Sequence, residues 1–273
     1  MKLSMMSYTL ARLPGFSVPG MFTMAKELQL EGVDMVTLYG HSAREIRNMA
    51  ADHDLPIVAY TFPAGEMGKD SEQERQIGVD KAKVGIDTAV ELGAPVVMIP
   101  PGPPADCRDA KRCRDNYIKG LQKIADYALQ AQVILTVENF PGQYSPFVTA
   151  DDFLAARAEV PGLMLTFDNG NAASGEDVAA SFTKVAPYVV HAHFKDWKIR
   201  TDPAEGWRLM RDGRYYQAAL IGEGNIDQKA TIAAMKKTGY DKYINVEYEG
   251  NAYSGEEAMR RAVRYLRELL AES

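Results

Sequence analysis

The feature that most constrains the fold of this chain is a regular alternation of two kinds of segment. Eight short runs of apolar or β-branched residues each precede a stretch whose apolar residues have helical spacing. The predicted strands are residues 3–8, 35–39, 57–62, 96–100, 134–139, 164–168, 189–195 and 243–249. Repeated strand and helix units imply parallel strands joined by crossovers, and eight units favour closure into a (β/α)8 TIM barrel. We expect residues 1–273 to form this barrel as a single domain.

An open, doubly wound sheet is the alternative fold for such an alternation. Its nucleotide-binding versions carry a GxGxxG fingerprint after the first strand, and the turn at residues 11–15 (Ala-Arg-Leu-Pro-Gly) lacks it. The chain also contains no Walker loop. The clearest predicted helix covers residues 71–92, where Ser71 and Glu74 form a capping box and Gly93 ends the helix. The last helix is expected to begin near Ser254.

Composition limits the functional classes. The chain is 46% hydrophobic and 25% charged, an ordinary mixture for a soluble globular protein, and no apolar run approaches the roughly 20 residues of a membrane span. The first ten residues resemble a strand rather than a signal peptide, so we expect a cytoplasmic protein without membrane contact. The net charge of −6 argues against a nucleic-acid partner. Cys107 and Cys113 are too few for a disulfide framework and are expected to be reduced surface thiols.

Four consecutive predicted strands end in residues of metal-ligand type, namely Glu138, Asp168, His193 and Glu247. The C-terminal ends of barrel strands meet at one mouth, where catalytic groups gather. The two-residue period of a strand lets all four side chains point inward. A lone carboxylate at a strand end is usually a helix cap or a surface ion pair. Three buried carboxylates with one imidazole instead require a compensating charge, which a divalent cation supplies.

The ligand set predicts which ion binds. Three carboxylates and one imidazole form a mainly oxygen site, which suits Mn²⁺ or Mg²⁺ better than a metal that prefers thiolates. We expect one divalent ion, with Mn²⁺ favoured and with Co²⁺ or Zn²⁺ able to substitute.

Several motifs resemble those of the sugar phosphate isomerase/epimerase superfamily, which includes xylose isomerase-like barrels and ketose 3-epimerases. The motifs are Val-Glu-Asn at 137–139, Phe-Asp-Asn-Gly-Asn at 167–171, His-Ala-His-Phe-Lys-Asp at 191–196, Gly-Glu-Gly-Asn-Ile at 222–226 and Val-Glu-Tyr-Glu at 246–249. The resemblance covers nearly the whole chain. It implies that Glu138 and Glu247 are both metal ligands and acid/base groups, whereas Asp168 and His193 are ligands only. Where ketose 3-epimerases tend to carry a substrate-binding histidine, this chain has Asn171.

Four residues are predicted to contact substrate: His41, Asn171, Lys195 and Glu223. Each except Asn171 has an alternative reading. The alternative for Lys195 is a salt bridge with a neighbouring carboxylate, for His41 a polar residue in a loop, and for Glu223 a tight Gly-Glu-Gly turn without a substrate contact.

Two further histidines are assigned structural positions. His191, two residues before His193 and therefore one layer deeper in the barrel, is interpreted as a hydrogen-bonded core residue. His53 lies in a loop at the opposite face of the barrel, where we expect it to be exposed.

One connection, residues 196–224, is unusually long and is interpreted as functional. A turn at residues 211–214 separates two short runs at 207–210 and 215–218, which predicts a β-hairpin over the barrel mouth. The hairpin is expected to close over substrate, and contact between copies in a homo-oligomer is the alternative.

These features predict a metal-dependent isomerase or epimerase of a keto sugar or a related polyol-derived ketone. A metal that chelates the carbonyl and an adjacent hydroxyl acidifies the neighbouring C–H and stabilises the resulting enediolate. The first alternative is a lyase that cleaves C-glycosides of 3-keto sugars by β-elimination at the same site. A non-catalytic sugar-binding barrel ranks lower. So does an endonuclease IV-like barrel, whose three metals need more histidines than the four present.

Overall fold

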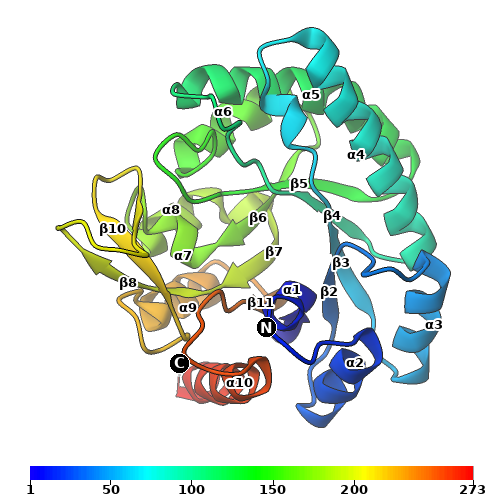
Figure 1. The fold of residues 1–273 in the computed structure, drawn as a ribbon, viewed down its shortest axis with the longest axis vertical. Helices are drawn as coiled ribbons and strands as arrows, with labels where there is room; N and C mark the ends of the chain where they lie inside the picture. The colour runs from blue at the N-terminus through cyan, green and yellow to red at the C-terminus, as the bar shows by residue number, and fades with distance from the viewer. Residues whose placement is uncertain (273) are drawn as a thin grey trace.

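Eight parallel strands close into a barrel in the order β1-β11-β7-β6-β5-β4-β3-β2 in the computed structural model, which describes residues 1–272 (Figure 1). The barrel strands are β1 (Lys2–Met6), β2 (Val33–Val36), β3 (Ile57–Thr61), β4 (Val96–Ile99), β5 (Ile134–Glu138), β6 (Met164–Asp168), β7 (Val189–Phe194) and β11 (Tyr243–Val246). Pairing of β1 with β11, beginning at Lys2 and Tyr243, closes the sheet and excludes the open doubly wound alternative. The predicted (β/α)8 TIM barrel is confirmed.

Helices surround the barrel, and a continuous apolar core fills the space between the two layers. They are α1 (Ser7–Ala11), α2 (Val18–Glu27), α3 (Ala43–Asp52), α4 (Glu72–Leu92), α5 (Ala110–Gln130), α6 (Ala150–Glu159), α7 (Asn169–Ala172), α8 (Val178–Val185), α9 (Gln228–Lys237) and α10 (Gly255–Glu272), with the 3₁₀ turns η1 (Gly65–Gly68) and η2 (Ala186–Tyr188). No helix in residues 1–272 is long and apolar enough to cross a membrane.

The predicted ends of these helices are confirmed, whereas only one of the two hydrogen bonds of the predicted capping box at Ser71 and Glu74 is present. Ser71 Oγ accepts a hydrogen bond from the Glu74 N–H at 3.4 Å and caps α4, and Gly93 ends that helix in the left-handed conformation with φ of 77°. Ser254 Oγ accepts from the Glu257 N–H at 3.2 Å at the start of α10.

The second strand differs from its predicted position. It covers Val33–Val36 rather than residues 35–39, because the backbone turns immediately afterwards. Thr37 and Tyr39 have φ values of 64° and 49°, which no extended strand accommodates. The earlier position places Asp34 within the strand.

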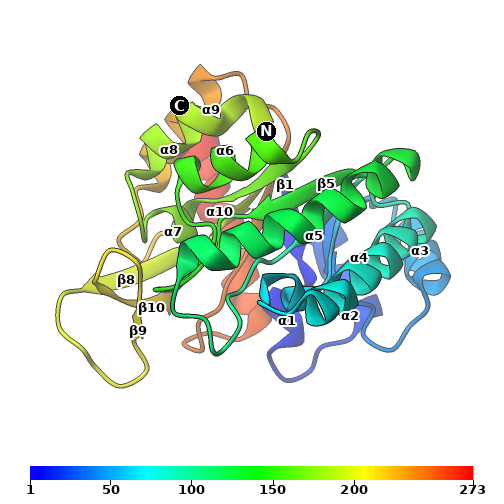
Figure 2. The same cartoon turned by 90° about the horizontal axis from the view of Figure 1, so that it is seen from above.

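The long connection contains a three-stranded antiparallel sheet, which we call the arm (residues 196–219). Its strands are β8 (Asp196–Arg200), β9 (Arg208–Leu209) and β10 (Tyr215–Ala219), in the order β8-β10-β9. The predicted hairpin of β9 and β10 is confirmed, and β8 adds a strand that was not predicted. The arm extends away from the barrel (Figure 2) and has its own small core, in which Trp197 and Tyr216 are fully buried.

Ion pairs and hydrogen bonds fix the arm to the body of the protein. Arg211, in the β9–β10 turn, lies 2.8 Å from Asp152 Oδ2 and also donates to the carbonyl of Ser145. Arg208, in β9, reaches Glu249 at the mouth with a separation of 2.8 Å. Both closure over substrate and contact between copies remain predictions.

Three expectations about exposure are wrong. Cys107 and Cys113 are free thiols as predicted, but they are buried, with 6% and 1% of their surfaces exposed. The first turn of α5 directs Cys113 toward the core, where it packs near Gly68, and the Cys107 thiol donates to the Asp109 carbonyl at 3.2 Å. His53 is half-buried because its ring stacks on Phe22 at a centroid distance of 5.8 Å.

Candidate metal centre

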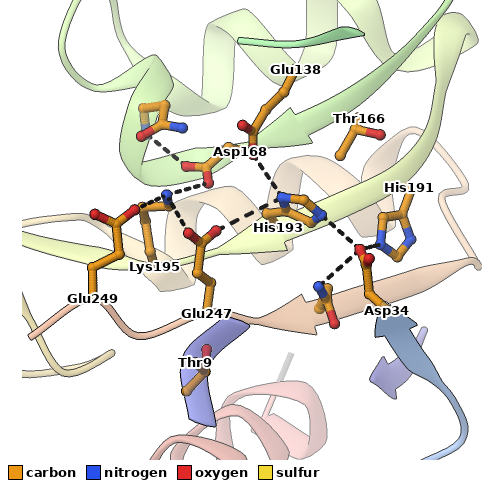
Figure 3. Close-up of polar contacts among 12 residues, drawn as sticks. Thr9, Asp34, Glu138, Thr166, Asp168, His191, His193, Lys195, Glu247 and Glu249 are labelled. Atoms are coloured by element: carbon orange, nitrogen blue, oxygen red, sulfur yellow. Dashed lines mark hydrogen bonds and ion pairs between the residues drawn. The ribbon is translucent and has the colours of Figure 1, made fainter. Parts of the chain in front are cut away.

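The four predicted ligands converge at the C-terminal mouth of the barrel (Figure 3). Each of Glu138, Asp168, His193 and Glu247 offers one ligand atom, and these atoms all lie within 4.8 Å of one another. Strand register explains the convergence, since β6 and β7 pair with Asp168 beside His193, and β11 and β7 pair with Asn245 beside His193. All four side chains are buried.

Neighbouring groups fix the positions of the ligand atoms. His193 Nδ1 lies 2.6 Å from Glu138 Oε1 and 3.8 Å from Glu247 Oε2. The side chain of Asn139 makes two hydrogen bonds with the backbone of Asp168. Asn139 Nδ2 donates to the Asp168 carbonyl at 2.6 Å, and Asn139 Oδ1 accepts from the Asp168 N–H at 2.9 Å. Asp168 Oδ1 accepts from the Asn171 N–H at 2.7 Å. The second oxygens, Asp168 Oδ2 and Glu247 Oε2, have no hydrogen-bond partner in the described part of the chain.

The electrostatics of this cluster favour a bound cation. Burial, opposed in part by Lys195, raises the pKa of Asp168 to about 7. Burial also raises the pKa of Glu247 well above its ordinary value. Ionised carboxylates in such a place are costly without a partner of opposite charge. Three carboxylates and one imidazole, with two carboxylate oxygens that accept no hydrogen bond among the described residues, therefore fit a divalent metal site.

Lys195 lies beside the four ligands and forms the salt bridges that were its alternative reading. Its Nζ is 2.9 Å from Glu247 Oε1, 2.9 Å from Glu249 Oε1 and 3.2 Å from Asp168 Oδ2. Glu249 also pairs with Arg208 of the arm, so the arm and the cluster share one ionic network. Sequence reasoning missed Glu249, although the Val-Glu-Tyr-Glu motif places it on the same strand face as Glu247.

Gly170 allows Lys195 to reach this position. A Cβ at residue 170 would lie 2.5 Å from Lys195 Cγ and 2.9 Å from Trp197 Nε1, and both of these side chains are buried. Gly170→Ala is therefore expected to lower the free energy of unfolding by about 1–3 kcal/mol through overpacking. Urea denaturation measures this change. Gly102→Ala is the control, because a Cβ there meets only an ordinary contact at 3.7 Å. Equal stability of the two variants would contradict the packing argument.

Asp34 is the second residue that sequence reasoning missed. Its Oδ2 lies 3.0 Å from His191 Nε2 and 3.1 Å from His193 Nε2 (Figure 3). The prediction that His191 is a hydrogen-bonded core residue is thereby confirmed. An aspartate inside the apolar run Val-Asp-Met-Val at 33–36 was the available signal.

The remaining predicted substrate residues differ in their burial and in their neighbours. Asn171 is fully buried beside Asp168, and neither atom of its side-chain amide has a hydrogen-bond partner among residues 1–272. His41 is half-buried in the loop between β2 and α3. Glu223 is exposed and points to Tyr253, whose hydroxyl donates at 2.9 Å, and to Arg261 at 3.6 Å. The structure therefore brings Asn171 to the ligands and places Glu223 outside them.

Several curated proteins have amino-acid sequences similar to this chain at low identity. An inosose dehydratase from Lacticaseibacillus casei is 27% identical over 139 residues, a match that covers 48% of this chain and 45% of the dehydratase. This chain thus matches less than half the length of that enzyme.

Solved structures share the fold over nearly their whole length. The apo form of 3-keto-D-glucoside 4-epimerase from E. coli has a TM-score of 0.75 and 17% identity, with 98% of this chain and 99% of that chain covered. The IolI protein with a bound zinc atom has a TM-score of 0.82 and 16% identity, covering 100% and 99%. D-psicose 3-epimerase has a TM-score of 0.77 and 14% identity, covering 99% of both chains.

A family model identifies the family of this chain. Residues 20–269 match the model described as xylose isomerase-like TIM barrel, which is most of the chain. The closed parallel barrel agrees with this match, and so does the cluster at the C-terminal ends of its strands. The chain therefore belongs to the xylose isomerase-like TIM barrel family.

Proposed function

We propose that this protein is a divalent-metal-dependent isomerase or epimerase of a keto sugar or a related polyol-derived ketone. One observation carries the proposal: two buried glutamates flank the other two ligands. Glu138 ends β5 and Glu247 follows β11, and the strands of Asp168 and His193 lie between them in the barrel. Two carboxylates on opposite sides of a substrate carbon can remove a proton and return one.

The ligand set supports a particular metal. We assign Mn²⁺ to the site, with Mg²⁺, Co²⁺ or Zn²⁺ as substitutes, because three of the four ligands are carboxylates. The structurally similar IolI protein has a bound zinc atom, which supports metal binding by a barrel of this fold. Such an ion would polarise a substrate carbonyl and acidify the adjacent C–H.

The protein groups supply the remaining chemistry. Glu138 or Glu247 takes the proton from the carbon beside the ketone, and the opposite glutamate or the same one returns it. Return to the other face of that carbon gives an epimer, and return to the neighbouring carbon gives an isomer. Lys195, whose Nζ lies beside the ligands, would donate to a substrate oxygen, and the side-chain amide of Asn171, which has no hydrogen-bond partner among residues 1–272, would offer a further donor and acceptor. Burial of the cluster keeps bulk water from competing for these contacts.

β-Elimination is the second candidate reaction. Proton abstraction beside a ketone also expels a β-substituent, and the matched inosose dehydratase is named for a loss of water. The same glutamates would act as the base. This alternative includes cleavage of C-glycosides of 3-keto sugars.

Turnover in D₂O separates these reactions. The enzyme, supplied with Mn²⁺, is incubated with a panel of ketoses, inososes and 3-keto glycosides. We expect an isomer or epimer with solvent deuterium on the carbon beside the carbonyl. Product without carbon-bound deuterium would indicate a hydride shift instead of proton transfer. Release of water or an aglycone would favour the lyase. Binding without turnover of any substrate would leave a sugar-binding barrel.

A further inference from the structure

Asp34 lies inside the barrel, and the His193 ring separates it from the three carboxylate ligands (Figure 3). It is fully buried in β2. One of its oxygens, Oδ2, receives hydrogen bonds from His191 Nε2 at 3.0 Å, His193 Nε2 at 3.1 Å and Asn245 Nδ2 at 3.2 Å. Asn245 is itself held by Ser4, whose hydroxyl donates to its side-chain oxygen at 2.9 Å. Direct contacts from β7 and β11, supported by Ser4 of β1, therefore fix the position of this carboxylate.

These contacts keep Asp34 ionised. Three N–H groups, from His191, His193 and Asn245, face the single oxygen Oδ2, and hydrogen bonds to a carboxylate favour its charged form. His191 Nε2 faces the same oxygen of Asp34 at 3.0 Å. An ionised carboxylate is an acceptor only, so each imidazole nitrogen that faces Asp34 must carry a proton.

The two nitrogens of His193 therefore have different roles. Nε2 faces Asp34 and holds a proton, whereas Nδ1 faces Glu138 Oε1 at 2.6 Å and lies within the four-ligand group. Without a metal, Nδ1 also donates to the Glu138 carboxylate. A bound metal ion would replace the proton on Nδ1, and the imidazole that keeps its proton on Nε2 would then offer the lone pair of Nδ1. The opposite tautomer would direct a proton into the ligand group and would leave Asp34 without one of its donors.

We propose that Asp34 is a positioning residue that fixes the ring orientation and the tautomer of His193, so that Nδ1 is the metal-binding atom. The inference rests on the proposed metal site and adds the residue that orients its only nitrogen ligand. A carboxylate behind a ligating histidine also makes the imidazole a stronger base, and loss of such a partner typically costs 10–100-fold in metal affinity.

Metal affinity tests the inference directly. Asp34→Ala is expected to weaken Mn²⁺ binding by about 10–100-fold, measured by competition with a chromophoric chelator. Asp34→Asn, which retains an acceptor oxygen, is expected to weaken binding less. The control is Thr136→Val, because Thr136 is also buried in the barrel interior but bonds Thr166 and the carbonyl of Val97 rather than His193. This variant is expected to bind Mn²⁺ as the wild type does.

Spectroscopy of the same proteins follows the ligand atom. The Co²⁺ visible spectrum is expected to change in Asp34→Ala and to be unchanged in Thr136→Val. In wild-type protein loaded with Zn²⁺, ¹⁵N–¹H correlation spectra are expected to show the His193 proton on Nε2. This last measurement needs no variant to fold.

Three results would overturn the role of Asp34: wild-type affinity with an unchanged Co²⁺ spectrum in Asp34→Ala, a Zn²⁺-bound Nε2 in His193, or a second ion held by Asp34 and His191. Each of them leaves the metal site itself intact. A wild-type protein that binds no divalent ion would instead remove the proposed function together with this inference.

Discussion

Replacing Glu138 or Glu247 with glutamine is expected to lower kcat by at least ~10²-fold, the lower range for a lost general base. Glutamine keeps an oxygen that can coordinate a metal, so part of the metal affinity should remain, whereas the amide cannot accept a proton at neutral pH. Steady-state kinetics on the best substrate from the D₂O panel, together with elemental analysis of each variant, separates loss of the base from loss of the ion.

Glu249→Gln is the matched control for this experiment. Glu249 is also a carboxylate bound to Lys195, but it lies outside the four-ligand group. Its replacement is expected to reduce kcat much less. A single glutamine variant that retains deuterium exchange while losing epimerisation would support a two-base mechanism. If Glu138→Gln and Glu247→Gln both retain wild-type kcat, proton transfer does not depend on these carboxylates.

The second large effect concerns thermal stability without metal. The metal-free protein is expected to lose stability as the pH rises from about 4 to about 7. Asp168 has its pKa raised to about 7 and Glu247 has a pKa well above its ordinary value, so the folded state retains protons on these groups that the unfolded state has already released. Stability falls with rising pH wherever the folded state binds more protons.

One buried group opposes this trend: burial lowers the pKa of His191, and this group alone would make stability rise as the pH rises toward 6.5. Asp168, Glu247 and His193 act in the opposite direction, so stability is still expected to fall. Burial lowers the pKa of His193, but the hydrogen bonds that its ring donates to the carboxylates of Asp34 and Glu138 raise it well above its ordinary value, and this group extends the loss of stability to higher pH. The lowered pKa values of Asp34 and Glu249 affect stability only in more acidic solution.

Thermal unfolding at several pH values, with chelator or with Mn²⁺, measures this prediction. Each kcal/mol of lost stability lowers Tm by roughly 2–4 °C in a chain of this size. Mn²⁺ is expected to raise Tm most at the highest pH, because ligand protons no longer compete with it. Asp168→Ala should abolish both metal binding and this effect of Mn²⁺. If the Tm of the metal-free protein, measured with chelator, rises between pH 5 and 7, the assigned pKa directions are contradicted.

The four candidate ligands were predictable because two local rules agree at each position. Strands place alternate residues on the same face, and parallel strands in a barrel end at one mouth, so Glu138, Asp168 and His193 needed no knowledge of distant contacts. Glu247 follows its strand by one residue, yet its N–H still donates to the Phe194 carbonyl at 2.9 Å and keeps it in register.

Asp34 and Glu249 were missed for a different reason. The backbone turn at Thr37 moves the second strand two residues toward the N-terminus, and only pairing with its neighbours reveals that shift. Glu249 acquires its position through Lys195 and Arg208, which come from other parts of the chain. Cys107 and Cys113 were misplaced because a run of charged neighbours in sequence says little about which face of a helix packs inward.

The sequence by itself determined the barrel, the ends of its clearest helices and the four residue types at its mouth, because hydrophobic period, capping and strand alternation act over a few neighbouring residues. Only the tertiary structure decided which nitrogen of His193 faces the ligands, which carboxylates Lys195 bridges and where the arm is anchored. Those features depend on side chains from different strands meeting within hydrogen-bonding distance, and their geometry is set by the register and closure of the whole barrel.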